Sequence, residues 1–220
     1  MKALQTEEPN DRQFSMSGQG AAYFIGVSRH RIGIDGVGVT TLAAFHGCPL
    51  RCRYCLNASC WGPTDRLATY TPESLLEKVR IDNLYFLATG GGICFGGGEP
   101  LMHPDFLVRF REICPSGWRL TLESSLNVPR AAVEAAAEVV DDFIIDIKDF
   151  NPGIYKRYTG RSNRRVLSNL KWLLKKKGAE RLLIRVPLIP DFNTDNDRDS
   201  TVAALESWGV TRIERFKYRV

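Results

Sequence analysis

Three cysteines lie within eight residues of one another, and their spacing is the strongest chemical signal in the sequence. Cys48, Cys52 and Cys55 stand in the stretch FHGCPLRCRYCLN, in the pattern C-x3-C-x2-C. Thiolates select iron–sulfur clusters, zinc or copper. A cubic four-iron cluster (4Fe-4S) has four corners, so three cysteines can hold three irons and leave one iron open. An open iron can bind a small molecule and pass an electron to it.

Two other interpretations of this stretch stay open. A zinc ion could take the three cysteines and His46, although structural zinc sites usually show two short ligand pairs separated by a longer gap. A disulfide framework would require an oxidising compartment, and residues 1–20 lack the apolar core of a signal peptide. Cys94 and Cys114 sit in apolar patterns typical of core residues, whereas Cys60 lies close to the stretch and has no assigned role.

With Tyr54 directly before the third cysteine, the pattern resembles the signature of radical S-adenosylmethionine (SAM) enzymes. In that family the open iron binds the amino and carboxylate groups of SAM. An electron from the cluster then cleaves the sulfonium into methionine and a 5′-deoxyadenosyl radical. The resemblance implies that Cys48, Cys52 and Cys55 hold the cluster and that Tyr54 lies near the adenine.

A glycine run, Gly96–Pro100, follows a predicted buried strand. Glycines let the backbone approach a ligand without a side-chain clash, and Glu99 adds a negative charge that can hold a cationic amine. A phosphate loop would require Lys and Ser or Thr after the glycines, and a turn without a ligand is the other alternative. The run resembles the GGEP motif of radical SAM enzymes, which implies that Gly97, Gly98 and Glu99 contact the amino group of SAM.

Asp146 and Lys148 end another predicted strand, and strand alternation places them on the same face. Two charges on a buried face are costly unless they are paired or liganded, so an internal salt bridge is the simplest alternative. Together with the following Tyr155–Gly160 stretch, YKRYTG, they resemble the glycyl-radical-enzyme activating subgroup. That resemblance implies that Lys148 meets the SAM carboxylate and that Asp146 joins a monovalent cation site.

Three further segments resemble this subgroup with departures. Glu123 and Ser124 stand where pyruvate formate-lyase activating enzymes have D-T-N-G, which implies oxygen ligands for a monovalent cation. Arg185 lies in IRVPLIPDFN, where the resemblance places an arginine near the SAM ribose, although an arginine reaching from a strand end to solvent is the alternative. Arg219 occupies the position of the histidine in a P-Y-H motif, so the contribution of that region is lost or altered.

Short strand-like segments alternate with helical ones along the chain, which predicts right-handed crossovers and a parallel sheet. The resemblance implies an α/β fold of one domain, a partial (β/α)6 TIM-like barrel over residues 21–220, after a flexible segment at residues 1–20. Ligand sites in such folds gather at the carboxyl ends of the strands, where each motif above falls.

The composition, 44% hydrophobic and 25% charged with a net charge of +5, is that of an ordinary globular protein. No apolar run is long enough for a membrane span, and a cytoplasmic location without membrane or nucleic-acid partners is expected. The basic run Lys175–Lys177 stands at a predicted helix end, where it offsets the helix dipole.

The resemblance covers residues 32–217 and implies a function. The expected reaction is reductive cleavage of SAM, followed by removal of a hydrogen from a backbone glycine in a large glycyl radical enzyme. Flavodoxin or ferredoxin is the implied electron donor. The alternatives are a radical SAM enzyme for a small molecule, similar to 7-carboxy-7-deazaguanine synthase, and a non-catalytic zinc or iron–sulfur module.

Overall fold

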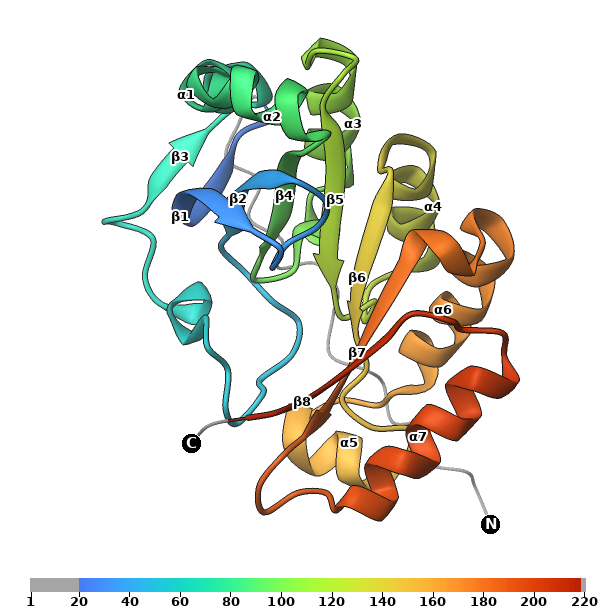
Figure 1. The fold of residues 1–220 in the computed structure, drawn as a ribbon. Coiled ribbons are helices and arrows are strands. Elements are labelled where there is room, and N and C mark those ends of the chain that lie inside the picture. Colours follow the sequence, from blue (N-terminus) through green and yellow to red (C-terminus); the bar gives the residue numbers. More distant parts are fainter. Residues whose placement is uncertain (1–19, 219–220) are drawn as a thin grey trace.

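Eight strands form one sheet, in the order β3-β1-β2-β4-β5-β6-β7-β8, in a computed structural model that describes residues 20–218 (Figure 1). The six strands from β2 to β8 pair in parallel, whereas β1 and β3 add an antiparallel edge beside β2. The predicted α/β class and the partial barrel of six parallel strands are confirmed. The predicted flexible segment lies almost wholly outside the described residues, as does Arg219.

The elements follow the chain in regular alternation after the antiparallel edge. The strands are β1 (Ala22–Ile32), β2 (Val39–Phe45), β3 (Ala68–Tyr70), β4 (Gly92–Gly97), β5 (Arg119–Ser124), β6 (Asp142–Asp146), β7 (Leu182–Leu188) and β8 (Ile213–Lys217). The helices are α1 (Pro72–Val79), α2 (Asn83–Thr89), α3 (Pro104–Ile113), α4 (Arg130–Val139), α5 (Pro152–Thr159), α6 (Arg164–Lys177) and α7 (Asp195–Ser207).

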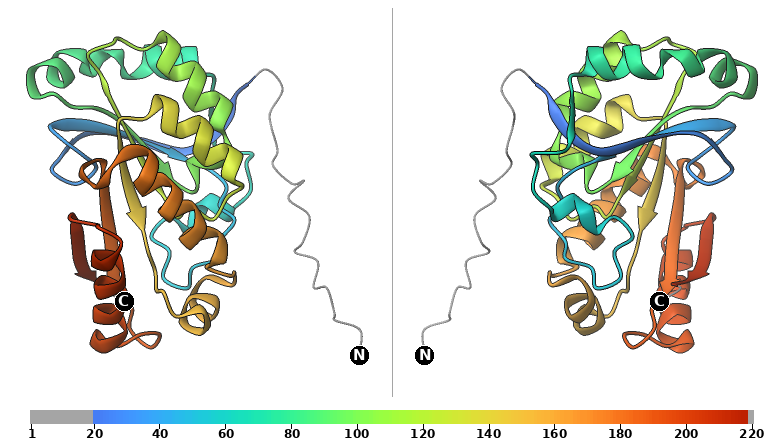
Figure 2. Two further views of the ribbon diagram at one scale, coloured as in Figure 1. Left: turned by 90° about the vertical axis from the view of Figure 1, so that its right-hand side faces the viewer. Right: turned by 90° about the vertical axis from the view of Figure 1, so that its left-hand side faces the viewer.

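Strand alternation sorts the side chains of the parallel strands onto two faces. On β4, Ile93 and Phe95 join the main hydrophobic core, which includes buried residues of α1, α3, α4 and α6. These helices contact one another in sequence and lie as a row against the sheet (Figures 1 and 2). On β5 and β6, Glu123 and Asp146 point to the opposite face, where they line a cavity. The sheet therefore separates a dry core from a polar site.

Capping residues set the ends of the helices, and the sequence pattern revealed only some of these helices. Thr71 caps α1, as the order Thr71-Pro72-Glu73 in the sequence favours, since its side chain accepts a hydrogen bond from the Ser74 amide at 3.2 Å. Helix α5 was not predicted. It begins where the Asn151 side chain accepts from the Gly153 amide at 2.9 Å, and it ends at Gly160 in the left-handed conformation (φ 76°). The stretch YKRYTG is therefore the last part of a helix and its cap.

The sequence of residues 21–35 favours one or two short strands, with His30 in a solvated loop between two arginines, and the structure corrects this expectation. The structure has one long strand, β1, and His30 lies within it at an irregularity in the pairing, with φ 56°. Arg29 and His30 both face the buried Asp82, at 2.9 Å from Arg29 Nε and 3.1 Å from His30 Nε2. This ion pair fastens the edge strand to the turn before α2.

Candidate functional site

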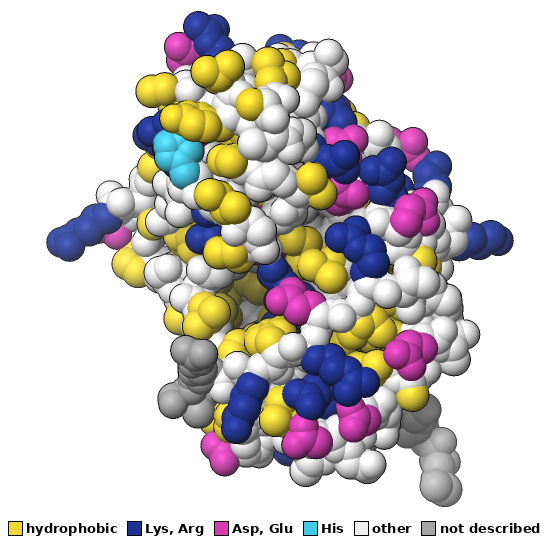
Figure 3. All heavy atoms as spheres, in the orientation of Figure 1, with side chains coloured by type: hydrophobic (Ala, Val, Ile, Leu, Met, Phe, Trp, Pro, Cys, Tyr) yellow, Lys and Arg dark blue, Asp and Glu magenta, His cyan; other side chains and the backbone are white. Residues whose placement is uncertain are grey.

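The three cysteines line one cavity of about 490 Å³ at the carboxyl ends of the parallel strands. The same cavity is lined by all but one of the predicted site residues. They are Cys48, Cys52, Cys55, Gly97, Gly98, Glu99, Glu123, Ser124, Asp146, Lys148 and Arg185. Figure 3 shows a hollow in the middle of this face, with charged and hydrophobic side chains around its rim. Motifs that are up to 137 residues apart in the sequence are therefore brought to one place by the fold.

The loop that carries the cysteines is held from behind by the end of α5. The Arg51 and Arg53 amides donate to the carbonyls of Thr159 (2.9 Å) and Tyr158 (3.2 Å). The Arg161 guanidinium donates to the Pro49 carbonyl at 3.1 Å. These bonds fix the backbone between the cysteines, and they give the YKRYTG stretch a structural role that its sequence did not reveal.

The glycine run packs directly on the cysteine loop. The Gly98 amide donates to the Phe45 carbonyl at 2.8 Å, and the Glu99 amide donates to the Gly47 carbonyl at 2.7 Å. A Cβ atom on Gly98 would lie 2.1 Å from the Gly47 carbonyl oxygen, so no other residue fits there. Asn57 adds a side-chain bond to the Gly97 carbonyl at 3.0 Å. We call residues 45–62 with residues 96–101 the cysteine wall of the cavity.

The electrostatics of the thiols differ along the loop. Burial raises the pKa of Cys48, with a further contribution from Glu99. Burial also raises the pKa of Cys52 to about 11, although Lys148 acts in the opposite direction. A hydrogen bond with Cys60 lowers the pKa of Cys55 to about 6. Buried thiols of this kind become thiolates most readily when a cation binds them, and binding then releases protons.

The three thiols lie on one loop and line one cavity, which suits a cluster. Among residues 20–218, no three His, Cys, Asp or Glu side chains converge closely enough to hold one metal ion. His46 instead contacts the Gly62 carbonyl through Nε2 at 2.9 Å. A zinc ion requires four ligands around one centre, whereas a cubane binds each thiolate at a different iron. Three separate thiols that line one cavity therefore fit a cubane.

Glu99 is buried in the cysteine wall and is surrounded by donors from the protein. Its carboxylate accepts bonds from the Ser124 hydroxyl (2.8 Å), the Ser125 hydroxyl (2.7 Å), the Ser125 amide (2.9 Å) and the Leu101 amide (3.3 Å). Burial raises its pKa, and the bonds from Ser125 and Ser124 offset part of this effect. The sequence did not predict that Ser124 would hold Glu99 in place.

The opposite side of the cavity is made of charged side chains and one tyrosine, which lie on β5 to β8 or directly after them, and we call it the charge wall. Its members are Glu123, Asp146, Lys148, Arg185, Glu214 and Tyr218. Asp146 and Lys148 lie on the same face, as predicted, while Ile147 enters the core. Lys148 Nζ donates to Asp146 at 3.0 Å and to the Tyr218 hydroxyl at 3.0 Å. The internal salt bridge considered above is thus present, and it lies at the cavity surface.

Lys148 keeps its charge in this setting. Burial lowers its pKa, but the Asp146 carboxylate and the Tyr218 hydroxyl outweigh that effect and place the pKa well above its ordinary value. Two of the three N–H groups of its ammonium donate hydrogen bonds within the protein, and the third can donate to a ligand in the cavity. Tyr218 was missed by the sequence analysis, although it is the tyrosine of the altered P-Y-H position.

Arg185 is tied into the charge wall by three partners. Its guanidinium donates to Glu123 at 2.6 Å, to Glu214 at 2.9 Å and to the Ile34 carbonyl at 2.6 Å. Burial raises the pKa of Glu123, and Arg185 lowers it. The alternative of an arginine reaching out to solvent is wrong for this chain, because only 17% of its side chain is exposed. Glu214 is another residue that the sequence analysis missed.

A model of the radical SAM superfamily matches residues 43–204. The chain is 30% identical to the choline trimethylamine-lyase activating enzyme of Oleidesulfovibrio alaskensis, over 74% of this chain and 71% of that protein. It is 30% identical to pyruvate formate-lyase 1-activating enzyme of Escherichia coli, over 84% and 76%. The chain belongs to the radical SAM superfamily, in the glycyl-radical-enzyme activating subgroup.

Coverage of the relatives is uneven. The (2S)-3-sulfopropanediol dehydratase activating enzyme of Klebsiella oxytoca is 36% identical, and the chain spans 46% of its length. Streptococcus suis SuiB has a similar fold, with a TM-score of 0.62 and 12% identity over 81% of this chain and 38% of SuiB. This structural likeness supports the radical SAM partial barrel. Within residues 20–218, no helix has the length and apolar character of a membrane span.

Tyr54 is the predicted site residue that does not line the cavity of this radical SAM chain. Its hydroxyl donates to Asp191 at 3.0 Å, and its ring lies edge-on to Phe192. The placement beside adenine therefore stays a prediction. The monovalent cation site at Glu123, Ser124 and Asp146 also stays a prediction, because these residues share the cavity but are each engaged by protein partners.

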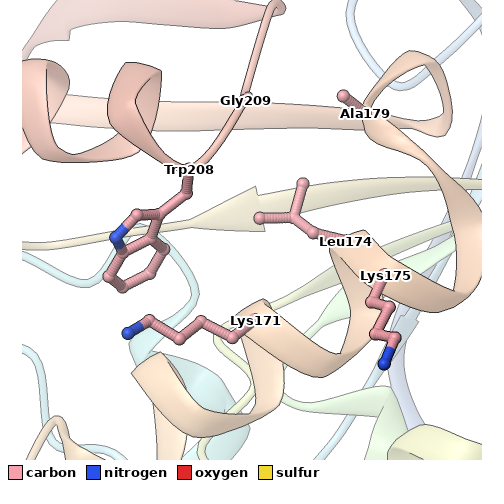
Figure 4. A pocket seen from close by; sticks show the side chains of 6 residues that line it. All are labelled: Lys171, Leu174, Lys175, Ala179, Trp208 and Gly209. Carbon is pink, nitrogen blue, oxygen red and sulfur yellow. The ribbon is translucent and has the colours of Figure 1, made fainter.

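A second hollow of about 420 Å³ lies between α6 and the turn after α7, and it shares no residue with the cysteine cavity (Figure 4). Lys171 and Trp208 both line this hollow, and Lys171 Nζ lies 4.3 Å from the centre of the Trp208 ring. The basic run ends nearby, where Lys177 donates to the Ala137 and Val140 carbonyls at the end of α4. The basic run forms the last turn of α6, as predicted, and Lys177 stabilises the end of the neighbouring helix as well.

Proposed function

We propose that this chain is a radical SAM activase that removes a hydrogen from a backbone glycine of a partner glycyl radical enzyme. The observation that carries the proposal is the convergence of three thiols, the glycine run and a buried lysine around one cavity. When bound, a 4Fe-4S cluster supplies the electron that cleaves SAM reductively into methionine and a 5′-deoxyadenosyl radical. The chain itself binds and orients these groups and excludes water.

The two walls bind different groups: the cysteine wall binds the cluster and the amino group of SAM. Cys48, Cys52 and Cys55 hold the cluster at the cysteine wall, where Gly97, Gly98 and Glu99 meet the amino group of SAM. Glu99 is suited to this role because Ser124 and Ser125 fix its position from below. These residues supply acceptor atoms that are already oriented before the ligand arrives.

The charge wall binds the carboxylate and the ribose of SAM. The third N–H group of the Lys148 ammonium donates to the SAM carboxylate, and Arg185 lies near the ribose. Tyr54 lies near the adenine after its contact with Asp191 opens. Glu123, Ser124 and Asp146 form a monovalent cation site when Arg185 and Lys148 turn toward the nucleotide. The existing ion pairs position these side chains at the cavity surface at no cost in unpaired buried charge.

The mouth of the cavity suits a protein substrate. Leu56 is 85% exposed and Ile34 is 52% exposed, and both line the cavity. Exposed apolar side chains at a site entrance favour contact with another chain. The curated relatives are named for the lyase, dehydratase or decarboxylase that each activates. A glycine loop of a large partner enzyme would enter between these two residues.

The electron donor would approach the back of the cysteine loop. Arg51, Arg53 and Arg161 are exposed there, and their backbone or side chains contact the loop. Flavodoxin and ferredoxin are acidic electron carriers, so a cationic surface close to the cluster favours either of them. This basic surface supports the proposal of such a donor.

Anaerobic reconstitution tests the proposed function. The protein is loaded with iron and sulfide, reduced with dithionite and given SAM, and 5′-deoxyadenosine is measured by chromatography. A glycyl radical enzyme is then added as candidate partner, and its glycyl radical is sought as a doublet by electron paramagnetic resonance. The proposal expects both signals, and Cys114→Ala serves as a control because Cys114 lies away from the cavity.

Other outcomes distinguish the alternatives. Cleavage of SAM with product from a small molecule and no partner radical would indicate an enzyme similar to 7-carboxy-7-deazaguanine synthase. A colourless protein that binds zinc and leaves SAM intact would indicate a structural module. Either result would overturn the proposed function, while the assignment of the family would remain.

A further inference from the structure

Tyr218 follows β8 directly and stands beside Lys148 in the charge wall. Its amide donates to the Leu188 carbonyl at 3.0 Å, which continues the pairing of β8 with β7 by one residue. Its ring lies edge-on to Phe216, with ring centres 5.2 Å apart, and tilted against Tyr158, with centres 6.2 Å apart. The backbone and the ring are therefore both held by the protein, and the hydroxyl has a defined place in the cavity wall.

The Tyr218 hydroxyl accepts a hydrogen bond from Lys148 Nζ at 3.0 Å. Nζ lies 5.6 Å from the centre of the ring, so the ammonium sits beyond the hydroxyl rather than over the face of the ring. The second bond of the ammonium goes to Asp146, also at 3.0 Å. Because the three N–H groups have tetrahedral directions, two fixed bonds also fix the third direction. Lys148 therefore offers a ligand one N–H group in one orientation.

The Tyr218 hydroxyl still has a hydrogen to donate. An ammonium can only donate, so the bond from Lys148 uses a lone pair of the hydroxyl oxygen and leaves its O–H group unused. Within residues 20–218, that O–H group donates to no protein acceptor, and the neighbouring Tyr158 hydroxyl is buried without a hydrogen-bond partner. Since Tyr218 lines the cavity, its O–H group is free to turn toward a ligand there.

Two donors side by side, one of them positively charged, match an anion that accepts two hydrogen bonds. A carboxylate has two oxygens with about four lone-pair sites, and hydrogen bonds to an ionised acceptor are stronger than those between neutral groups. SAM carries one anionic group, which is its carboxylate. A sugar hydroxyl fits this place less well, because it has a hydrogen of its own that also needs an acceptor.

We propose that Tyr218 is a second binding residue for the carboxylate of SAM. Its hydroxyl accepts from Lys148 and donates to the carboxylate, so that the N–H of Lys148 and the O–H of Tyr218 converge on the same group. The inference rests on the proposed function, because it requires SAM in the cavity with its carboxylate at Lys148. The residue after the last strand thereby contributes to recognition of the methionine end of the nucleotide.

The test measures the binding of two ligands, SAM and decarboxylated SAM, which lacks the carboxylate. The proteins are the parent, Tyr218→Phe, Lys148→Met and the double variant, each reconstituted anaerobically. Dissociation constants are measured by equilibrium dialysis. Tyr70→Phe is the matched control, because Tyr70 lies on β3 and does not line the cavity. Urea unfolding verifies that each variant is folded, and the Phe ring keeps the contacts of the Tyr218 ring.

We expect Tyr218→Phe to bind SAM about tenfold more weakly than the parent, equivalent to about 1.4 kcal/mol, because a hydrogen bond to a charged group is lost. Its affinity for decarboxylated SAM should equal that of the parent, since that ligand never makes the bond. The double variant should bind SAM more weakly than Lys148→Met, because the tyrosine O–H group reaches the carboxylate without the lysine. Tyr70→Phe should match the parent with both ligands.

Three results would overturn the inference and spare the proposed function. Equal SAM affinity in Tyr218→Phe and the parent would show that the hydroxyl does not contact the ligand. Equal losses for SAM and decarboxylated SAM would place the contact on another part of the nucleotide. Equal SAM affinity in Lys148→Met and the double variant would make Tyr218 a positioning residue for Lys148 alone. A parent protein that assembles no cluster and binds no SAM would overturn the proposed function itself.

Discussion

The cysteine wall and the charge wall face the same cavity but are built in different ways. The cysteine wall is held by backbone bonds between β2, β4 and their loops, such as Gly98 to Phe45 and Glu99 to Gly47. The charge wall is held by side-chain ion pairs between strands, such as Arg185 with Glu123 and Lys148 with Asp146. The first kind of structure is fixed before any ligand binds, and the second can exchange partners when a charged ligand arrives.

The largest expected effect lies in the cysteine wall. Cys52→Ala should reduce iron loading and 5′-deoxyadenosine formation to background, because two thiolates cannot hold a cubane with one open corner. The fold should persist, since the loop backbone is bonded to α5 through Arg51 and Arg53 rather than through the thiols. Iron analysis and far-ultraviolet circular dichroism measure the two effects, with Cys114→Ala as control. Normal iron content in Cys52→Ala would remove the basis for the cluster.

The charge wall should respond next, through both stability and binding. Lys148→Met leaves Asp146 without its cation, and we expect a loss of about 2 kcal/mol in the free energy of unfolding. The loss is moderate because the Asp146 side chain is 38% exposed and water solvates part of its charge. SAM affinity should fall at least tenfold, or about 1.4 kcal/mol. Urea unfolding and equilibrium binding of SAM to the reconstituted protein measure the two quantities.

A double variant separates these two effects. Lys148→Met with Asp146→Asn removes both charges and should recover most of the stability while SAM binding stays weak. If the double variant recovered binding as well, Lys148 would act through the ion pair alone and would not contact the nucleotide. If neither variant changed binding, the charge wall would be structural only.

A titrating group under the cysteine wall gives a third, smaller effect. His103 stacks on Phe45 with ring centres 5.3 Å apart, and burial lowers its pKa to about 4. The unfolded chain binds a proton at the ordinary pKa, near 6.5, so the native state is less stable wherever only the unfolded state is protonated. Stability should therefore fall as the pH drops from about 6.5 to about 4.

His103→Gln is the matched control for this pH dependence. Other groups also lose stability in acid, so the measured quantity is the difference between parent and variant in urea unfolding at pH 7 and pH 4.5. We expect the parent to lose more stability than the variant. Equal losses would mean that His103 is protonated in the native state and that the stacking does not exclude water.

The two walls also differ in how far their features could be predicted from the sequence. The cysteine wall is made of short motifs, so Cys48, Cys52, Cys55 and the glycine run could be recognised from spacing alone. The parallel strands were predictable from alternation for the same local reason. The backbone contact that requires glycine at position 98 was not predictable, because it joins two loops that are far apart in the sequence.

The charge wall depends on pairings that no local pattern encodes. Strand alternation placed Asp146 and Lys148 on one face, but nothing nearby indicated that Tyr218 would accept a bond from Lys148 across 70 residues. The partners of Arg185 are Glu123, 62 residues before it, and Glu214, 29 residues after it. The antiparallel strand β1 was likewise shortened in the prediction because its irregularity at His30 interrupts the alternation.

The smallest expected effect concerns the coupling between Arg185 and Glu123. Double-mutant cycles with Arg185→Gln and Glu123→Gln should give a coupling of about 1 kcal/mol in urea unfolding. The value is small because Arg185 keeps Glu214 at 2.9 Å when Glu123 is neutralised, so Arg185 loses only one of its two acidic partners. Adding saturating SAM should lower this coupling if Arg185 turns toward the ribose, since the ion pair is then already open. A coupling that is the same with and without SAM would show that the charge wall does not exchange partners, and the difference drawn between the two walls would fail at that point.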